Sequence, residues 1–248
     1  MALSDRMKHV LMLVTNHKAI ADIGCDHGYM AIELIRSGKA EHVIAVDINQ
    51  GPLERAKENV DAHGLSKAIE TRISDGMEAL CQGEVQGVIC AGMGGKTICG
   101  IIGRRRMFSQ TLDELVLQPQ SELHIVRRYL RENGFRIIAE DMVLEDGKFY
   151  PMMRVNPIGD GTDAKAFCHV GQAVQMQRVE DRYGPCLIAG AHPVLQQFLQ
   201  KEKAVCEEIL QSLSAQDSKK SLARREELAQ RLSDIAFAER QMEQNRTE

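Results

Sequence analysis

Several features that would point to particular protein classes are absent or scarce in this chain of 248 residues. Tryptophan is absent and aromatic residues make up 4%, which argues against a stacking platform for single-stranded nucleic acid. The formal net charge is −4, so no global positive field indicates a nucleic-acid partner, and any such binding must use local patches. No apolar run approaches the length that a bilayer-spanning helix needs.

Cysteine and histidine are present, but not with the spacing of metal ligands. The seven cysteines form no C-x-x-C pair and the eight histidines form no H-x-x-x-H pair, so we expect no bound metal. An odd number of scattered cysteines is typical of free thiols in a reducing compartment. The first ten residues lack the long apolar stretch of a signal peptide. These features together predict a cytoplasmic protein.

The chain is organised around the segment ADIGCDHGY, residues 21–29. Apolar residues around Asp22 predict a buried strand, and apolar residues after Gly28 recur with the spacing of a helix. Gly24 and Gly28 would let backbone amides approach a ligand closely. A dinucleotide fingerprint needs the pattern G-x-G-x-x-G, whereas here Asp26 lies between the glycines and would repel a pyrophosphate. The turn therefore favours a ligand without phosphate.

A second acidic residue indicates a nucleoside ligand. The apolar run Val43 to Val46 predicts another buried strand, which ends at Asp47. An acidic residue about 20 positions after such a glycine turn is placed to bind a ribose diol. The alternative is that Asp47 caps the helix predicted to begin at Gly51-Pro52. We favour ribose binding because of the spacing.

Strands and helices alternate as far as Gly134, which predicts an α/β fold with a doubly wound, mostly parallel sheet. Ser4 is expected to cap a first helix that includes Met7, and Ser121 is expected to cap the helix after the fifth strand. Residues 135–144 and 149–155 predict a terminal β-hairpin. A loop at 156–161 indicates a domain boundary, so we expect one domain at 1–156 and a second at 157–248. Two apolar stripes, over residues 195–213 and 222–242, predict an antiparallel helical hairpin of coiled-coil type in the second domain.

Polar and glycine-rich segments follow three other predicted strands. The third strand is predicted at Ile69 to Ile73, and Asp75-Gly76 follows it as a ligand contact or as a simple turn. Residues 91–95, AGMGG, come after the fourth; their backbone could support a flat base, although such turns also bind phosphate. Gln118 and Pro119 follow the fifth strand and point to the same crevice, where Gln118 either contacts the substrate or caps the next helix.

Arginines form a local basic patch. Arg104 and Arg105 end one predicted helix, and Arg128 lies in the next. Arginine near a helix C-terminus is favourable because of the helix dipole. The other interpretation is a rim that binds the phosphates of a nucleic acid. The sequence leaves both open.

These motifs resemble those of the bacterial TrmK-type tRNA (adenine-N1)-methyltransferases, which modify adenine 22. The similarity covers nearly the whole length, including Gly184-Pro185, and rests on ADIGCDHGY, Asp47 with Gly51-Pro52, Ser74-Asp75-Gly76, IxAGMGG at 89–95, LxLQPQ at 115–120 and LEDGKFY at 144–150. It implies a Rossmann-like class I methyltransferase domain, a C-terminal coiled-coil domain, S-adenosyl-L-methionine as cofactor, and tRNA as substrate.

The resemblance also implies a set of site residues. The expected cofactor-binding residues are Asp22, Gly24, Cys25, Asp26, His27, Gly28, Asp47, Ile48, Asp75, Gly76, Ala91, Gly92, Met93 and Gly94. The turns and the arginine patch described above add the expected substrate-binding residues, which are Gly95, Gln118, Pro119, Arg104, Arg105 and Arg128. Asp26 and His27 are the candidate catalytic residues. We favour Asp26, because it occupies the place of the middle glycine in the related turns.

The implied chemistry needs no general base, because adenine N1 has a free lone pair at neutral pH. Direct displacement at a sulfonium methyl depends mainly on geometry. A carboxylate near the exocyclic amine, such as that of Asp26, would stabilise the positive charge that develops on the ring. N1 lies on the Watson–Crick edge, so the base must be unpaired or flipped out. Two alternatives remain, a methyltransferase acting on another RNA, a protein or a small molecule, and a non-catalytic RNA-binding module.

Overall fold

The protein consists of two compact units, Met1–Ala164 and Lys165–Glu248. The computed structural model describes residues 3–158, 170–213 and 218–247. The change from one unit to the other falls between 158 and 170, outside the described residues, and the predicted domain boundary at 156/157 lies just before it.

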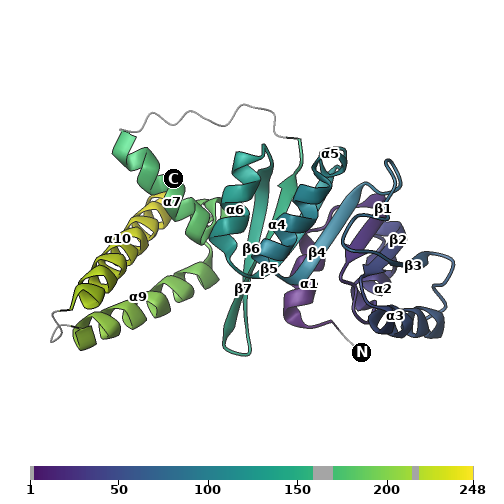
Figure 1. Cartoon of the computed structure of the whole chain (residues 1–248), viewed down its shortest axis with the longest axis horizontal. Helices are drawn as coiled ribbons and strands as arrows, with labels where there is room; N and C mark the ends of the chain where they lie inside the picture. The colour runs from purple at the N-terminus through teal and green to yellow at the C-terminus, as the bar shows by residue number, and fades with distance from the viewer. Residues whose placement is uncertain (1–2, 159–169, 214–217, 248) are drawn as a thin grey trace. The chain divides into compact units, whose positions relative to one another are not determined.

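The first unit is built on a seven-stranded sheet in the order β3-β2-β1-β4-β5-β7-β6 (Figure 1). The strands are β1 (His17–Ile23), β2 (Ala40–Asp47), β3 (Ile69–Ile73), β4 (Gly87–Gly94), β5 (Glu114–Ser121), β6 (Arg136–Glu145) and β7 (Lys148–Asn156). Strands β1 to β5 are parallel, whereas β7 lies antiparallel between β5 and β6. The predicted doubly wound sheet with a terminal hairpin is confirmed.

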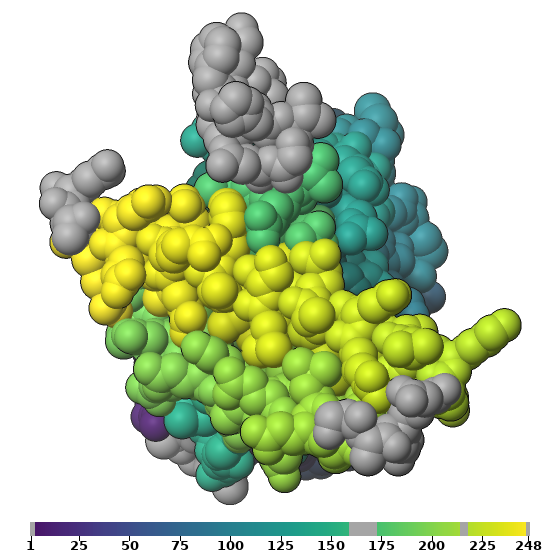
Figure 2. Space-filling view, turned by 90° about the vertical axis from the view of Figure 1, so that its left-hand side faces the viewer, coloured from purple at the N-terminus to yellow at the C-terminus, as the bar shows by residue number. Residues whose placement is uncertain are grey.

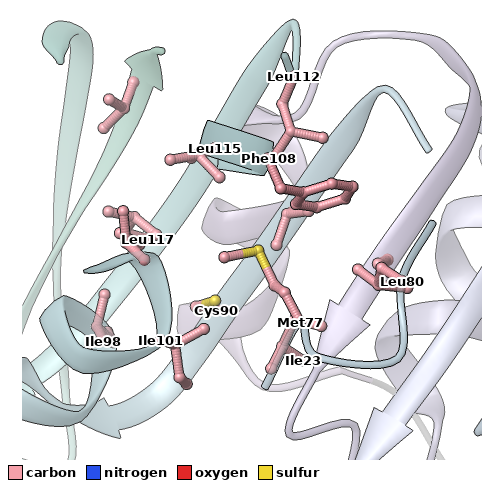
Figure 3. Packing of buried hydrophobic residues seen from close by; sticks show 14 of the residues in the cluster. Ile23, Met77, Leu80, Cys90, Ile98, Ile101, Phe108, Leu112, Leu115 and Leu117 are labelled. Atoms are coloured by element: carbon pink, nitrogen blue, oxygen red, sulfur yellow. The ribbon is translucent and has the colours of Figure 1, made fainter. Parts of the chain in front are cut away.

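Helices cover both faces of this sheet. They are α1 (Asp5–Leu13), α2 (Tyr29–Arg36), α3 (Gln50–Ala62), α4 (Gly95–Arg104), the short α5 (Arg106–Ser109) and α6 (Leu123–Glu132). One apolar cluster joins α1, α2 and α3 to the sheet, and another joins α4, α5 and α6 to its other face. Figure 3 shows the second cluster, in which Ile98 and Ile101 of α4 lie near Cys90 of β4 and Met77. Burial of such side chains contributes about 1.5–3 kcal/mol each, so it fixes α4 and β4 around the segment that joins them.

Two helix starts show how far local sequence determines the fold. Ser4 caps α1 as its sequence predicts, and its Oγ accepts a hydrogen bond from the Met7 amide at 3.3 Å. The predicted capping of α6 by Ser121 is wrong. Ser121 is still paired with Gly94 at the end of β5, so the cap moves to Glu122, which has a left-handed backbone with φ 57°. The Glu122 carboxylate instead accepts from the Lys96 amide at 3.2 Å, in the first turn of α4.

The second unit contains α7 (Val170–Tyr183), α8 (Pro185–Ala189), α9 (Pro193–Leu213) and α10 (Lys219–Thr247). Helices α9 and α10 lie side by side (Figure 2). Arg225 of α10 donates to the Leu213 carbonyl and Arg246 donates to Gln196, so opposite ends meet and the pair is antiparallel. The predicted helical hairpin is therefore confirmed.

Within the described ranges, no helix has both the length and the apolar character that crossing a bilayer requires.

Candidate active site

The arrangement of the central strands determines where a ligand can bind. β1 pairs with β2 on one side and with β4 on the other, so the chain leaves the sheet in opposite directions at the carboxyl ends of β1 and β4. Ligands of open α/β sheets bind in the crevice at such a switch point. A pocket of about 530 Å³ lies there. Its lining includes the predicted residues Asp22, Gly24, Cys25, Asp26, His27, Ala91 and Gly92.

The turn after β1 depends on left-handed backbone conformations. Gly24 has φ 77° and Gly28 has φ 72°, and a Cβ on Gly28 would lie 3.1 Å from the Ala56 Cβ on α3. Asp26 has φ 45°, which few residues other than glycine adopt but aspartate tolerates. Asn59 of α3 holds the same turn by donating to the His27 carbonyl at 2.9 Å. Aspartate can therefore occupy the place of a glycine without changing the path of the turn.

The Asp26 side chain is available to a substrate. It is 66% exposed, and its carboxylate oxygens lie 3.6 Å from Arg55 Nη2 and 3.7 Å from His27 Nε2. These distances are longer than hydrogen bonds, so the carboxylate is only loosely held. The His27 ring stacks on Tyr29 at a centroid distance of 5.9 Å, which fixes His27 along the wall of the pocket.

Asp22 has the most unusual environment of the site. It is 3% exposed, and its Oδ2 has no hydrogen-bond partner in the part of the chain that the structure describes. Burial, and then the charge of Asp47, raise the pKa of Asp22 to about 7. A buried carboxylate without a partner is costly unless a cation or donor meets it. The residues therefore fit a ligand that brings a positively charged donor to the floor of the pocket.

A second group of predicted residues lies at the ends of β2 and β3. The Asp47 Oδ1 accepts from the Asn49 amide at 2.9 Å, and Asn49, not Asp47, is the N-cap of α3. Asp47 is paired in register with Ile73. Ile48 is 57% exposed and Ile73 is 56% exposed, which is unusual for isoleucine and provides an apolar surface for a flat ring. Ile73 was not among the site residues expected from the sequence.

Asp75 and the neighbouring arginines form a charged rim after β3. Arg104 Nη2 donates to Asp75 Oδ1 at 2.8 Å, and Arg104 Nε lies 3.4 Å from Glu78 Oε1. Arg105 donates to the carbonyls of Glu78 and Leu80. Arg128 is exposed on α6. The loop after β3 therefore holds Arg104 and Arg105, whereas Arg128 lies on a different helix.

The glycine-rich segment after β4 is supported from beneath. Strand pairing continues to Gly94 with irregularities at Met93, and Gly92 has φ 80°. Gln118 is completely buried, and its Oε1 accepts from the Gly92 amide at 3.2 Å. Gly95 is buried at the start of α4, where a Cβ would lie 2.6 Å from the Ser121 carbonyl oxygen. Gln118 and Gly95 thus fix the glycine-rich turn from its buried side, and Gly92, Met93 and Gly94 form its accessible surface.

Helix α1 contributes to this site in a way that the sequence analysis missed. Leu3, Ser4, Arg6 and Met7 line the pocket, together with Tyr29, Met30 and Gln120. Ser4 and Met7 were predicted only as parts of a first helix. Nothing in their spacing indicates a site, because the contact depends on how α1 packs against β6 and the sheet.

Comparisons with known proteins agree with this geometry. A family model described as a methyltransferase domain matches residues 3–153. The tRNA (adenine(22)-N(1))-methyltransferase of Bacillus subtilis is 32% identical over 234 residues, which cover 93% of this chain and 94% of that protein. The chain belongs to this methyltransferase family.

Solved structures of similar proteins include two with a bound nucleoside. This methyltransferase has a TM-score of 0.78 and 28% identity with the Streptococcus pneumoniae protein Sp1610 in complex with S-adenosyl-L-methionine, covering 96% of this chain and 99% of that one. For M. capricolum TrmK in complex with S-adenosyl-homocysteine, the TM-score is 0.76 at 25% identity, covering 94% and 98%.

Proposed function

We propose that this protein transfers a methyl group from S-adenosyl-L-methionine to N1 of adenine 22 in tRNA. The observation that carries the proposal is the pocket at the β1/β4 switch point, where the partnerless Asp22 oxygen and the exposed Asp26 meet the glycine-rich turn. Membership of the methyltransferase family supports the reaction class, and the names of the relatives support the substrate. The reaction would take place in the cytoplasm, where tRNA is modified.

The residues present fit the cofactor. Asp22 would accept a hydrogen bond from its ammonium group, and Asp47 would accept from its ribose hydroxyls. Ile48 and Ile73 would cover the adenine ring, and Asp75 would meet the adenine amine after exchanging its bond with Arg104. When bound, S-adenosyl-L-methionine supplies an electrophilic methyl group on a positively charged sulfur.

The acceptor side of the pocket needs to position a base and not to deprotonate it. The N1 lone pair of adenine is available at neutral pH, so correct placement supplies much of the rate. The surface formed by Gly92, Met93 and Gly94 would support the flat base. Asp26 would accept from its exocyclic amine and stabilise the positive charge that develops on the ring. Because a paired base cannot reach this pocket, adenine 22 must be unpaired or flipped out.

The proposed function is tested by methylation of an unmodified tRNA transcript. We expect the full-length protein to form 1-methyladenosine at position 22, located by nuclease digestion and mass spectrometry of the fragments. A transcript with guanosine at position 22 is the matched control and should remain unmethylated. Methylation at another position, or of protein only, would contradict the proposal. Cofactor binding without methylation of any tRNA would instead support a non-catalytic module.

The role of Asp26 is tested with two variants that suit its backbone conformation. Asn and Gly both tolerate the positive φ of this position, whereas alanine would add strain. We expect Asp26→Asn and Asp26→Gly to lower kcat on the order of 10²-fold, the scale of one positioned catalytic group. Cofactor affinity, measured by calorimetry, should change little. If either variant keeps full turnover, or if both lose cofactor binding, Asp26 does not have this role.

A further inference from the structure

Arg6 of α1 joins three segments that lie far apart in the sequence. Its Nη1 donates to the Gln118 Oε1 at 2.7 Å across a separation of 112 residues. The same oxygen accepts from the Gly92 amide at 3.2 Å, and Gln118 Nε2 donates to the Pro119 carbonyl at 3.3 Å. Both lone pairs of this buried amide oxygen are therefore used, one by a charged donor and one by the glycine-rich turn.

The hairpin of β6 and β7 holds Arg6 from the other side. The Arg6 amide donates to Glu145 Oε1 at 3.1 Å, and Arg6 Nε lies 4.0 Å from Glu145 Oε2. The guanidinium lies over the ring of Tyr150, 5.2 Å from its centroid. Glu145 and Tyr150 belong to the LEDGKFY motif, to which the proposed function assigns no role. Through these contacts, Glu145 and Tyr150 of this motif hold the Arg6 side chain in place.

Arg6 also lies at the surface of the pocket. It is part of the lining, and a Cβ on Gly92 would be 3.7 Å from Arg6 Nη1 and 3.7 Å from Gln120 Nε2. The Arg6 side chain is 21% exposed. It is thus placed between the hydrogen-bonded support of the turn and the space where a base would enter.

We propose that Arg6 is a positioning residue for the acceptor adenine, which it serves by fixing the orientation of the Gln118 amide and thereby the amide of Gly92. The inference rests on the proposed function. The arginine guanidinium has only donors, so it is compatible with a single orientation of the Gln118 amide, in which the oxygen faces both Arg6 and the Gly92 N–H. Without Arg6 the amide can rotate and present its NH₂ to the Gly92 N–H, two donors that repel, and the turn would relax.

The test compares variants of one helix in the full-length protein. Arg6→Met keeps the apolar stem and removes the donors, and Arg6→Lys keeps the charge. Lys8→Met is the matched control, because Lys8 is exposed on the same helix and donates to Asp5, and neither residue lines the pocket. We expect Arg6→Met to lower kcat on the order of 10- to 100-fold, as small misplacements do, with cofactor Kd changed less than about twofold. Arg6→Lys should recover part of kcat, and Lys8→Met should behave as wild type.

A structural readout that does not depend on catalysis completes the test. Hydrogen exchange of a peptide covering residues 91–96 should speed up in Arg6→Met, and peptides from α2 and β2 should be unchanged. Unchanged kcat in Arg6→Met, or faster exchange throughout the unit, would overturn the inference, as would slowed kcat without faster exchange at 91–96. If wild type forms no 1-methyladenosine, the proposed function fails, and the exchange data alone then decide whether Arg6 fixes the turn.

The same mechanism predicts the outcome of a double-mutant cycle. Gln118→Met removes the acceptor that joins Arg6 to Gly92, so Arg6→Met should add little to its effect on kcat. The double variant should be within about threefold of the Gln118→Met single variant. If the two fold-changes multiply instead, Arg6 acts independently of Gln118 and the proposed connection is wrong.

Discussion

Cofactor affinity should depend on pH through one buried carboxyl group. The pKa of Asp22 is raised from an ordinary value of 3.8 to about 7, first by burial and then by the charge of Asp47. Without cofactor, Asp22 is therefore largely protonated at pH 6. A bound ammonium group needs the ionised form, so binding at pH 6 must release a proton. Above pH 8 the group is already ionised and no proton is released.

The size of the effect follows from linkage. Below the pKa, each unit of pH should weaken cofactor binding by about tenfold, which is about 1.4 kcal/mol. Calorimetry at pH 6 and pH 8, in pairs of buffers that differ in ionisation enthalpy, measures both the affinity and the number of protons released. We expect close to one proton at pH 6, close to none at pH 8, and roughly tenfold tighter binding at pH 8. In Asp22→Asn both pH dependences should disappear.

The same group should make the cofactor-free protein less stable as pH rises. A raised pKa means that the folded state holds the Asp22 proton more tightly than the unfolded state does. The contribution of Asp22 to the free energy of unfolding is therefore fully present below pH 3.8 and is lost as pH rises through about 7. The difference between a pKa of 3.8 and one of about 7 corresponds to on the order of 4 kcal/mol at pH 8. Urea unfolding should therefore find Asp22→Asn more stable than wild type at pH 8 and nearly equal at pH 4.

Two results would refute this reasoning. One is a wild-type affinity that is the same at pH 6 and pH 8 with no proton released. The other is Asp22→Asn binding the cofactor as tightly as wild type at pH 8, because Asp22 would then not meet the ammonium group. Asp47→Asn offers a further check, since loss of the neighbouring charge should move the transition to lower pH.

Three further outcomes are expected. Asp47→Ala should weaken cofactor binding by about 1.5–3 kcal/mol by calorimetry, as for a charge-assisted hydrogen bond, and an unchanged Kd with an intact circular dichroism spectrum would exclude ribose binding. Asp234 is fully buried and accepts from Arg178 at 2.7 Å, and the Arg178 side chain is 34% exposed. Asp234→Ala should therefore destabilise the C-terminal unit by about 1.5–3 kcal/mol, the scale of a hydrogen bond to a charged group. Hydrogen exchange in α7 and α10 should become faster, and unchanged exchange there would contradict this. If the C-terminal unit grips tRNA, changing exposed Lys203, Lys219 and Lys220 to Gln should raise KM for tRNA and flatten its salt dependence, leaving cofactor Kd alone, whereas equal KM values would argue against the grip.

The sequence predicted those parts of the fold and site that depend on near neighbours in the chain. Apolar residues around Asp22 and before Asp47 determine buried strands, and the turns that follow are short. Parallel strands bring their carboxyl ends to one edge of the sheet, which is why residues 22–28 and 91–92 could be expected to share a pocket. The helical hairpin could be predicted equally well, because each apolar stripe repeats within a single helix.

Contacts across long separations could not be predicted in this way. Arg6 has an unremarkable position in an amphipathic helix, and only the packing of α1 against the sheet brings it to Gln118. Gln118 was expected at the surface of the crevice or as a cap, and its complete burial depends on the covering turn at Gly92. Ile73 was predicted as the end of a strand, and its position opposite Asp47, next to Ile48, depends on the register in which β3 pairs with β2.

Three of the carboxylates near the crevice differ in ways that give each a separate task. Asp22 is buried with a partnerless oxygen, so it can bind a cation strongly but cannot reach a bulky base. Asp47 is half-buried and already accepts one backbone amide, which aims it along the end of β2. Asp26 is 66% exposed on a left-handed turn, so among the three it is the one that a base entering from solvent can meet. Burial and backbone conformation thus give carboxylates of the same chemical type different roles, as the environment does for paired carboxylates in other active sites.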